Sequence, residues 1–501
     1  MINLKLNELL TYVEPIEVAV NLERNAEVKG VTSNSKEVMP GYVFFCIKGT
    51  RHDGHEFVYE AFERKAAAIV CEKRIDLPED APIIYVSSTR RAYAMAASAL
   101  HGFPSRFFKL VGVTGTNGKT TTTFMLESTF KAAGYRTGLI GTVVNKINDV
   151  KIPVRHTTPD PVKLQELFKS MKDSGVQLAA MEVSSHAIDQ QRIAGTSFDV
   201  LVFTNLSQDH LDYHGSLEEY ARVKSSLFFE NPRLPWVINI DDLHGRKLFE
   251  IGKKMGTEIL TYGFVDEAMI RPENVESNID GINFKLRFKD KVLGKVTLPL
   301  TGKFNIYNAL AAFGAAYLLG IDFDTYVRGI AAMDRVPGRF EVIRSSEEFY
   351  VVVDYAHTPD GLQKVTDTCL ELLQGKGRLV TVFGCGGDRD RDKRPKMGRI
   401  AAERSAVVIL TSDNPRSEDP EKIIQDILSG IPDQLKNKVI VEVDRKKAIF
   451  KAIETAKPGD IVLIAGKGHE TYQIFKDRTV HFDDREVALE ALAERGKEFA
   501  F

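Results

Sequence analysis

The stretch KLVGVTGTNGKTTTTFMLE, Lys109 to Glu127, constrains the fold of this chain more than any other. It begins with an apolar run typical of a buried strand, continues through a glycine-rich turn, and ends in a hydroxyl-rich helix start. The spacing is shorter than the strict Gly-x-x-x-x-Gly-Lys-Ser/Thr pattern, because position 113 is Val113 rather than glycine. We therefore expect a strand, a shortened phosphate-binding loop and a helix, as in an α/β sheet.

This loop has the chemistry of a nucleotide phosphate site. Glycines allow backbone N–H groups to turn toward phosphate oxygens, and the helix N-terminus adds partial positive charge. Lys119 can reach the outer phosphates and Thr120 can bind magnesium, so ATP is the expected nucleotide. The alternative is a plain glycine turn before a capped helix. The residues predicted to bind the nucleotide here are Thr114, Gly115, Thr116, Asn117, Gly118, Lys119 and Thr120.

The order of apolar and helical segments predicts an α/β protein of three domains, since 501 residues exceed one ordinary core. Residues 1–108 contain short β-rich runs (41–49 and 66–72) and an alanine-rich helix (90–102). In residues 109–336, strands and helices alternate as in a central doubly wound phosphate-loop ATPase sheet. After a Pro-Gly pair, residues 337–501 form a second, Rossmann-like α/β series.

The predicted buried strands are short apolar runs bounded by turns. In the central domain they are LVGVTG, TGLIG, LAAMEVSS, DVLVFTNL and WVINID, and in the C-terminal domain YVVVDYAH, RLVTVFGCGG, AVVILTSD and DIVLIAGKG.

The composition favours small-molecule partners. Lys and Arg number 67 against 69 Asp and Glu, so no polybasic surface indicates nucleic acid or membrane binding. No apolar run is long enough for a membrane span, and the first residues lack a signal-peptide core, so we expect a cytoplasmic protein.

The four cysteines, Cys46, Cys71, Cys369 and Cys385, form no CxxC pair, which argues against a zinc site or a disulfide framework.

Two polar clusters follow predicted strands of the central domain. MEVSSH contains Glu182, Ser184, Ser185 and His186, and TNLSQDHLDYHGS contains Asp209, His210, Asp212 and His214. Ligands bind beyond the carboxyl ends of parallel strands, so both clusters should approach the phosphate loop. Thr120, Glu182 and His210 then form a candidate magnesium shell. Alternatively, His210 and His214 are polar residues at a helix start.

Together, the motifs GVTGTNGKTTTT, EVSSHAID, TNLSQDHLDYHGS, GKFNIYN, VPGRFE, DYAHTPD, GCGGDRDRDKRPKMG, SDNPRSEDP and AGKGHETYQ resemble the Mur ligase family of peptidoglycan synthesis. The resemblance runs through all three predicted domains in family order. It is strongest to members that join meso-diaminopimelate to UDP-N-acetylmuramoyl-L-alanyl-D-glutamate. It implies that ATP phosphorylates the D-glutamyl γ-carboxylate and that the incoming amine then displaces phosphate, with little covalent chemistry left to the protein.

The resemblance also assigns roles to single residues. Lys224 resembles the family's lysine that carbon dioxide carbamylates and that faces a second magnesium ion; without the family it is an ordinary helix-surface lysine. The resemblance implies nucleotide contacts for Asn308, Arg339, Asp354 and His357, although Asn308 is equally a helix-start cap. The candidate catalytic residues are Lys119, Lys224 and His210.

The resemblance implies that the UDP-sugar dipeptide binds across the first two domains. The matching residues are Ser35, Thr157, Thr158, Ser184, Gln190 and Arg192. One departure is Asn34-Ser35-Lys36, where relatives often have Asp-Ser-Arg. A lysine lacks the bidentate fork of arginine, so the diphosphate contacts of Lys36 are expected to differ.

The C-terminal domain is expected to select the amino acid. Arg389 and Arg416 offer two guanidiniums suited to carboxylates, and Glu470 is suited to an ammonium group. The full set implied by the resemblance is Arg389, Asp413, Asn414, Pro415, Arg416, Gly466 and Glu470. Arg416 is the expected reader of the extra carboxylate of meso-diaminopimelate; the alternative is a surface residue paired with Glu418 or Asp419.

Other functions stay open at this point. The same ligase could add L-lysine, the chain could resemble a folylpolyglutamate synthetase, or it could bind a nucleotide without turnover. We expect a monomer with no nucleic acid partner and no membrane insertion.

Overall fold

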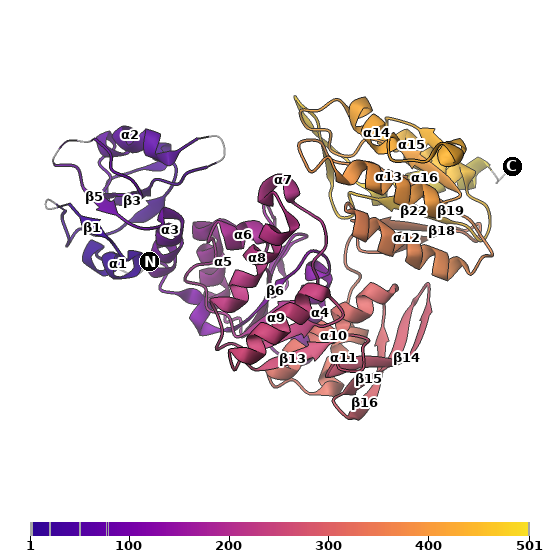
Figure 1. Cartoon of the computed structure of the whole chain (residues 1–501), viewed down its shortest axis with the longest axis horizontal. Helices are drawn as coiled ribbons and strands as arrows, with labels where there is room; N and C mark the ends of the chain where they lie inside the picture. The colour runs from indigo at the N-terminus through magenta and orange to yellow at the C-terminus, as the bar shows by residue number, and fades with distance from the viewer. Residues whose placement is uncertain (1–3, 20–21, 50–51, 77, 79, 499–501) are drawn as a thin grey trace. The chain divides into compact units, whose positions relative to one another are not determined.

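The computed structural model describes residues 4–19, 22–49, 52–76, 78 and 80–498 (Figure 1). Its internal contacts divide the chain into two compact units. The first unit contains Met1–Thr114, Gly134–Leu201 and Val223–Pro235; the second contains Gly115–Ala133, Val202–Arg222 and Trp236–Phe501. Strand β11 (Val200–Phe203) and helix α8 (Leu217–Phe229) lie at the division.

The N-terminal sheet has the strand order β1-β5-β4-β3-β2. Its elements are β1 (Glu17–Val18), β2 (Gly30–Thr32), β3 (Tyr42–Phe45), β4 (Ala68–Cys71), β5 (Ile83–Tyr85), α1 (Leu6–Val13), α2 (Val58–Glu63) and α3 (Thr89–Leu100). Alternate side chains of a strand point to opposite faces. Val43 and Phe45 therefore pack in one core cluster with residues of α1 and α3, whereas Phe44 and Cys46 pack in another with residues of α2.

The other strands of the first unit follow the predicted phosphate-loop strand. Strands β6 (Lys109–Thr114), β10 (Leu178–Glu182) and β7 (Thr137–Ile140) pair in parallel, and β8 (Asn145–Ile147) and β9 (Val150–Ile152) extend β7 antiparallel. Helices α5 (Pro161–Asp173) and α6 (Ser185–Asp189) belong to the same unit. Residues of β6, β7 and β10 are buried except Lys109, as expected of parallel strands covered on both faces.

In the second unit, β12 (Trp236–Asn239) and β13 (Ile259–Tyr262) are parallel, and β14 (Ile270–Asn278), β15 (Gly281–Phe288) and β16 (Lys291–Leu298) continue mainly antiparallel. The helices here are α4 (Lys119–Ala132), α7 (Leu211–His214), α9 (Leu243–Lys254), α10 (Lys303–Leu318) and α11 (Phe323–Ala331). We did not expect β14 to β16 from the sequence, because their half-exposed, charged residues lack the continuous apolar run of a buried parallel strand.

The C-terminal sheet, also in the second unit, has the order β17-β18-β22-β19-β20-β21. Its strands are β17 (Glu341–Arg344), β18 (Tyr350–Asp354), β19 (Leu379–Phe383), β20 (Val407–Leu410), β21 (Val439–Val441) and β22 (Ile461–Ala465), all parallel except β17. The remaining elements are α12 (Pro359–Leu373), α13 (Lys393–Arg404), α14 (Pro420–Leu428), α15 (Arg445–Thr455), α16 (Asp484–Glu498), β23 (Tyr472–Ile474) and β24 (Thr479–His481).

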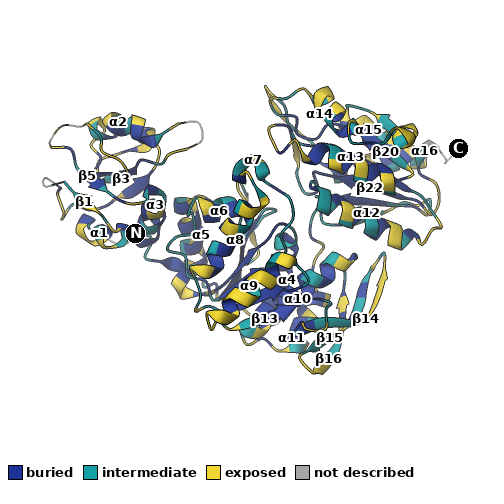
Figure 2. Cartoon of the chain, viewed as in Figure 1, coloured by how far each residue is buried: buried dark blue, intermediate teal, exposed yellow. Residues whose placement is uncertain are grey.

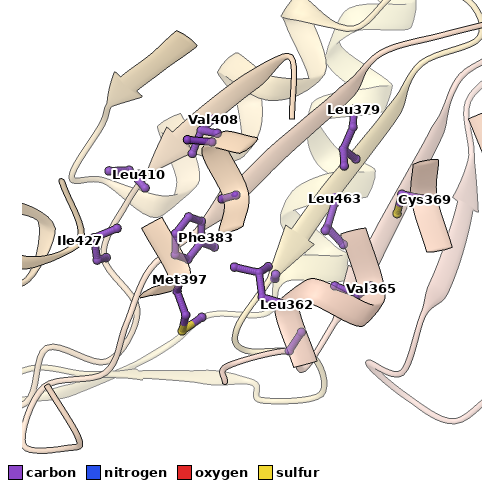
Figure 3. Close-up of a cluster of buried hydrophobic side chains, with 14 of the residues drawn as sticks. Leu362, Val365, Cys369, Leu379, Phe383, Met397, Val408, Leu410, Ile427 and Leu463 are labelled. Carbon is purple, nitrogen blue, oxygen red and sulfur yellow. The ribbon is translucent and has the colours of Figure 1, made fainter. Parts of the chain in front are cut away.

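Helices cover both faces of this sheet, which confirms the Rossmann-like prediction. Figure 3 shows one core, where Leu362 and Val365 of α12 and Met397 of α13 lie against Phe383 and Leu463 of the sheet. The opposite face packs against α15 and α16. The inner strands β18, β19, β20 and β22 are mostly buried, whereas the edge strands β17 and β21 and the outer helix faces are partly exposed (Figure 2).

All nine apolar runs predicted as strands contain β-strands, and the alanine-rich run forms α3. A search of the described helices finds none that combines the length and apolar character of a membrane span. The domain boundaries at 108 and 336 stay predictions.

A buried ion pair joins the starts of α15 and α16. The Arg445 guanidinium donates from Nε and Nη2 to the two oxygens of Asp484 at 2.7 Å each, and neither side chain is accessible to solvent. Removing one partner leaves an uncompensated buried charge.

Asp484→Ala is therefore expected to lower the free energy of unfolding by about 3 to 5 kcal/mol, measured by chemical denaturation. The matched control is Glu490→Ala, because Glu490 and Lys446 join the same two helices as an exposed pair at 2.7 Å. Exposed pairs contribute little, so the control should be far less affected. Equal losses in both variants would contradict this account.

Candidate active site

The phosphate loop in the second unit depends on two glycines with positive φ. Gly115 has φ +145° and Gly118 has φ +89°, conformations that side chains other than glycine rarely adopt. A Cβ on Gly115 would lie 1.9 Å from Thr204 Oγ1, and one on Gly118 would lie 2.3 Å from Asn308 Oδ1. The loop backbone therefore approaches its neighbours more closely than any side chain would permit. Thr114, the last residue of β6, is fully buried.

The segment after β11 fixes this loop. Asn117 N–H donates to Asn205 Oδ1 at 3.0 Å, and Thr204 Oγ1 donates to the Asn117 carbonyl at 2.6 Å. Thr116 N–H donates to the Asn205 carbonyl at 2.8 Å, and Ser207 N–H donates to Thr116 Oγ1 at 3.0 Å. These bonds tie Thr116 and Asn117 of the loop to the segment from Thr204 to Ser207 that follows β11.

Lys119 and Thr120 begin α4 at the end of this loop. Lys119 Nζ donates to the carbonyls of Gly115 at 2.9 Å and Thr116 at 2.8 Å, so its ammonium group lies over the loop. The buried Thr120 hydroxyl accepts a hydrogen bond from Arg339 Nη2 at 3.0 Å. A fixed cation at a helix N-terminus is the chemistry that binds phosphate.

A cavity of about 430 Å³ opens beside the loop in the second unit, within the size range of small-molecule sites. Six residues predicted to contact the nucleotide line it, namely Asn117, Gly118, Asn308, Arg339, Asp354 and His357. The lining also includes Asn239, Asp241, Lys303, Phe304, Tyr307 and Tyr355, which we did not predict. Phe304 and Tyr307 are part of the motif GKFNIYN, which also contains Asn308. Their place in that motif could have indicated that they lie near the nucleotide.

Asp354 shapes the backbone of this cavity. Its two oxygens accept hydrogen bonds from Phe340 N–H at 2.7 Å and Ala356 N–H at 2.8 Å. Burial raises the pKa of this carboxyl group, and the nearby Arg339 opposes the change. The Arg339 guanidinium carbon lies 4.6 Å from the centre of the Tyr355 ring, a cation–π contact. Asp354 therefore positions the segments that carry Arg339 and His357.

His210 and His357 both lie near Asp209, a residue that we placed in a polar cluster but did not predict as part of the site. Asp209 Oδ2 is 3.4 Å from His210 Nε2 and 3.9 Å from His357 Nε2. Burial alone would raise the pKa of Asp209, but the attraction of His210, His357 and other cations outweighs it and brings the pKa to about 2. Burial lowers the pKa of His357, whereas Asp209 opposes that change.

Asp360 is a second carboxylate that we did not predict. One of its oxygens accepts from Asn117 Nδ2 at 2.8 Å, Lys364 Nζ at 2.8 Å and Ser207 Oγ at 3.3 Å. It thus joins the start of α12 to the phosphate loop. The motif DYAHTPD contains Asp360, but spacing alone did not show this contact, since Asn117 and Asp360 are 243 residues apart.

Glu182 and Lys224, two predicted metal ligands, are both buried in the first unit. Glu182 accepts from Thr142 N–H at 2.7 Å and Thr142 Oγ1 at 2.9 Å. Lys224 on α8 is only 1% exposed, so the interpretation as a surface lysine is wrong. Thr120 and His210 belong to the second unit, and the magnesium shell stays a prediction.

Five predicted substrate residues form one network in the first unit. Arg192 donates to the Thr158 carbonyl at 3.0 Å and to Gln190 Oε1 at 2.6 and 3.0 Å. Thr158 Oγ1 accepts from Ser184 N–H at 3.0 Å, and Thr157 Oγ1 lies 3.1 Å from Thr142 Oγ1. The network presents hydroxyls, an amide and a guanidinium, which suit a polar anionic ligand.

Ser35, a further predicted substrate residue, is buried and donates from Oγ to Glu60 Oε2 at 2.6 Å. Asn34 Oδ1 accepts from Lys36 N–H at 3.2 Å and so caps the short 3-10 helix that begins at Ser35. Asn34 therefore has a local structural role as the cap of this short helix.

Arg416 and Arg389 lie near each other in the C-terminal region. Arg416 has φ +54°, is half-buried, and donates to the Gly387 carbonyl at 2.7 Å. Burial lowers the pKa of its guanidinium group, and the like charge of Arg389 lowers it further. Within the part of the chain that the structure describes, Arg416 forms no ion pair, because Glu418 binds Arg391 and Arg394 instead.

The other predicted amino-acid-binding residues lie around Asn414. Its Nδ2 donates to Glu470 Oε2 at 2.8 Å, and Lys467 Nζ donates to both Asn414 Oδ1 and Glu470 Oε2, at 3.2 and 3.0 Å. Asp413 and Pro415 are buried, and a Cβ on Gly466 would lie 2.8 Å from Asp413 Oδ2. We did not predict Lys467, although it lies within the motif AGKGHE.

Three family models match the chain in succession. They are the Mur ligase family catalytic domain at residues 27–101, the Mur ligase middle domain at 113–316, and the Mur ligase glutamate ligase domain at 338–468. The chain belongs to the Mur ligase family. As a Mur ligase, it has the three-domain α/β fold expected from its sequence.

This Mur ligase is similar to named relatives along its length. It is 45% identical, over 99% of the chain and 100% of the relative, to the UDP-N-acetylmuramoyl-L-alanyl-D-glutamate--2,6-diaminopimelate ligase of Bacillus velezensis. A solved structure of a ligase with the same name has a TM-score of 0.70 at 33% identity, covering 99% of this chain and all of that one. The folylpolyglutamate synthase of Mycobacterium tuberculosis shares the fold at 20% identity, with a TM-score of 0.62 over 75% of this chain and 92% of that one.

Glu418 supports the loop that carries Arg416. The charge of Glu418 depends on pH. Hydrogen bonds from Arg394 lower the pKa of Glu418 from 4.5 to about 2. A carboxyl group whose pKa is lower in the folded than in the unfolded state stabilises the fold at pH values above its unfolded-state pKa. This contribution disappears as the pH falls through the folded-state pKa. Glu418→Gln should therefore destabilise the protein at neutral pH.

The difference in unfolding free energy between wild type and Glu418→Gln should shrink as pH falls from 4.5 to about 2, measured by denaturation at each pH. The exposed Glu276 provides a control, Glu276→Gln, for the change in overall charge. A difference that stays constant across this pH range would show that the Arg394 contact is not the cause.

Proposed function

We propose that this Mur ligase uses ATP to join meso-diaminopimelate to the D-glutamyl γ-carboxylate of UDP-N-acetylmuramoyl-L-alanyl-D-glutamate. The observation that carries the proposal is the 45% identity, over nearly the whole of both chains, to a relative whose name states these two substrates. The cavity beside the phosphate loop supports a nucleotide, because loop, α10 and C-terminal residues line it together.

The loop fits a triphosphate on structural grounds. A Cβ at Gly115 or Gly118 would collide with Thr204 or Asn308, so only glycine lets the loop turn tightly into the N-terminus of α4, which begins at Lys119. Lys119 supplies a cation at the same place. The proposed nucleotide contacts are those of the phosphate loop together with Asn308, Arg339, Asp354 and His357.

The proposed reaction has two steps. The γ-carboxylate oxygen attacks the terminal phosphorus of ATP, the bond to ADP breaks, and an acyl phosphate forms. The neutral amine of meso-diaminopimelate then attacks the acyl carbon, a tetrahedral intermediate forms, and phosphate leaves as the amide loses its extra proton. Lys119 contributes charge stabilisation and orientation rather than covalent chemistry.

Two magnesium ions, when bound, would neutralise the charge that builds up on the transferred phosphoryl group. The proposed ligands are Thr120, Glu182, His210 and Lys224 as a carbamate. An ammonium group would repel a divalent cation, whereas a carbamate offers an anionic oxygen. The burial of Lys224 supports this role, since a buried lysine requires a specific compensating environment.

We assign the UDP-sugar dipeptide to the network of Thr157, Thr158, Ser184, Gln190 and Arg192, and to Ser35. We assign the incoming amino acid to Arg389, Asp413, Asn414, Pro415, Arg416, Gly466 and Glu470. The mutual repulsion of Arg389 and Arg416 supports an anionic group between them, because a carboxylate would offset both charges. We also propose that the chain acts as a monomer in the cytoplasm.

A phosphate-release assay tests the function directly. The full-length protein is incubated with ATP, magnesium and the UDP-muramoyl dipeptide, and with meso-diaminopimelate, L-lysine or no amine. We expect release that depends on meso-diaminopimelate, and the tripeptide product by mass spectrometry. Equal release without amine would exclude a ligase, a preference for lysine would exclude the proposed selection, and glutamate addition to a folate would favour the folylpolyglutamate alternative.

Arg416→Lys is the matching variant for selectivity. It keeps the charge but loses the planar fork, so the preference for meso-diaminopimelate over lysine should fall by about 10² to 10⁴-fold in kcat/KM. Arg399→Lys controls for the same change at an exposed position of the same region. Unchanged selectivity in Arg416→Lys would remove this residue from the recognition of the extra carboxylate.

Lys224→Ala is expected to abolish turnover, and carbonate should partially restore weaker variants at this position. A direct readout is the carbamate signal in NMR after equilibration with isotope-labelled bicarbonate, which Lys224→Ala should lack. Circular dichroism checks the fold, and Lys247→Ala serves as an exposed control. Turnover at the wild-type rate in Lys224→Ala would refute the carbamate role.

A further inference from the structure

Two cysteines and a histidine, none of which is assigned to the reaction above, meet in the interior of the N-terminal region. Cys46 Sγ and Cys71 Sγ are 3.5 Å apart. These two sulfurs and one ring nitrogen of His55 all lie within 4.8 Å of one another. The cysteines are fully buried and His55 is 8% exposed.

The pairing of β3 with β4 brings the sulfurs together. The two strands are parallel, with Val43 opposite Ala68 and Phe45 opposite Val70. Cys46 follows β3 and Cys71 ends β4, so continuing the register places them side by side. Cys46 N–H donates to the Val70 carbonyl at 2.9 Å, which keeps the strands paired up to this point. Both cysteines belong to the same core cluster.

The segment after β3 turns back on itself and brings His55 next to the two cysteines. Lys48 and Asp53 form an antiparallel bridge, and Gly54 N–H donates to the Ile47 carbonyl at 2.9 Å. A Cβ on Gly54 would lie 2.6 Å from Ile47 N and 3.0 Å from the carbonyl carbon of Cys46. Glycine at this position therefore lets the segment of His55 pack directly against Cys46.

The surroundings of His55 resemble those of a metal-binding histidine. Its Nδ1 lies 2.6 Å from Asp53 Oδ1, and Asp53 Oδ2 accepts from Lys73 Nζ at 2.8 Å. A carboxylate on one ring nitrogen fixes the tautomer and leaves the other nitrogen with its lone pair. That nitrogen, Nε2, accepts a 3.2 Å hydrogen bond from Glu72 N–H, the bond that a metal ion would replace.

Charge balance selects the kind of ion. Asp53 and Lys73 already neutralise each other, so two ionised cysteines would leave a net charge of minus two in the interior. A divalent cation cancels that charge, and an uncompensated charge is strongly disfavoured where no solvent reaches. Thiolate and imidazole ligands together favour zinc over magnesium or calcium.

We propose that Cys46, Cys71 and His55 form a binding site for a thiophilic divalent cation of the zinc type. On binding, the two thiols lose their protons and the cation joins the ends of β3 and β4 to the segment after the 48–53 bridge. The site serves the stability of the N-terminal region and is independent of the proposed ligase reaction. We had argued against zinc because no CxxC pair is present, but the two cysteines meet across neighbouring strands, 25 residues apart in the chain.

Titration of the reduced full-length protein with cobalt(II), a spectroscopic substitute for zinc, tests the site. We expect one equivalent to produce a thiolate-to-metal charge-transfer band that zinc abolishes. Cys46→Ser and Cys71→Ser should each remove most of the band, and the buried Cys369→Ser should keep it. No band in the wild type, or an unchanged band in both Cys46→Ser and Cys71→Ser, would overturn the proposal.

Asp53→Asn provides a test that does not remove a ligand. Asparagine can still accept from His55 N–H, as Asp53 Oδ1 does at 3.0 Å, so the local fold should persist under circular dichroism. Loss of the carboxylate behind a ligating histidine should weaken zinc affinity about 10 to 100-fold, measured by competition with a chromophoric chelator. Unchanged affinity would overturn the proposed role of His55, and no binding of zinc by the reduced wild-type protein would overturn the site.

Discussion

The close packing of the phosphate loop against the segment after β11 is the constraint on which the proposed site depends. Gly115 approaches Thr204 so closely that no Cβ fits, and the backbone of Asn117 is bonded by the side chains of Thr204 and Asn205. These contacts fix the loop, so a bound phosphate would meet the N-terminus of α4 and the Lys119 ammonium group already in place. Preorganised dipoles of this kind need no reorganisation during the reaction. The position of Lys119, and the side of the cavity that Gly118 and Asn308 line, follow from the same packing.

Close packing also shapes the proposed amino-acid site in the C-terminal region. Glycines permit close backbone approach around Asp413 and Pro415, and Arg394 binds Glu418, which leaves Arg416 directed at backbone carbonyls. The result is a pair of guanidiniums with like charges, and an anion between them would offset both charges. A chain built for a neutral or cationic side chain would gain nothing from this arrangement, and this is why the region supports selection of a substrate with an extra carboxylate.

Sequence patterns were most informative where the chemistry is local. The strand, glycine turn and helix around Gly118 occur within one short stretch, and the buried strands of both larger sheets are continuous apolar runs, so all could be predicted. The antiparallel strands β14 to β16 could not, because their apolar residues are separated by charged ones. Asp360 and Lys467 were missed, although both lie within quoted motifs, because their partners Asn117 and Asn414 are distant in sequence. The cysteine pair was missed for the same reason. Adjacent parallel strands bring Cys46 and Cys71 together, but their separation in the sequence matches no known metal-binding motif.

The sequence by itself determined the fold class and the family, and it predicted which residues form the phosphate loop, because these depend on short motifs and on the period of apolar residues. Only the tertiary structure decided which side chains share a cavity, that Lys224 is buried, and that Cys46, Cys71 and His55 meet. Burial and long-range contact result from strand register and loop packing, which many residues determine together. No single motif contains that information, so the electrostatic environment of Asp209 and Arg416 emerged only in three dimensions.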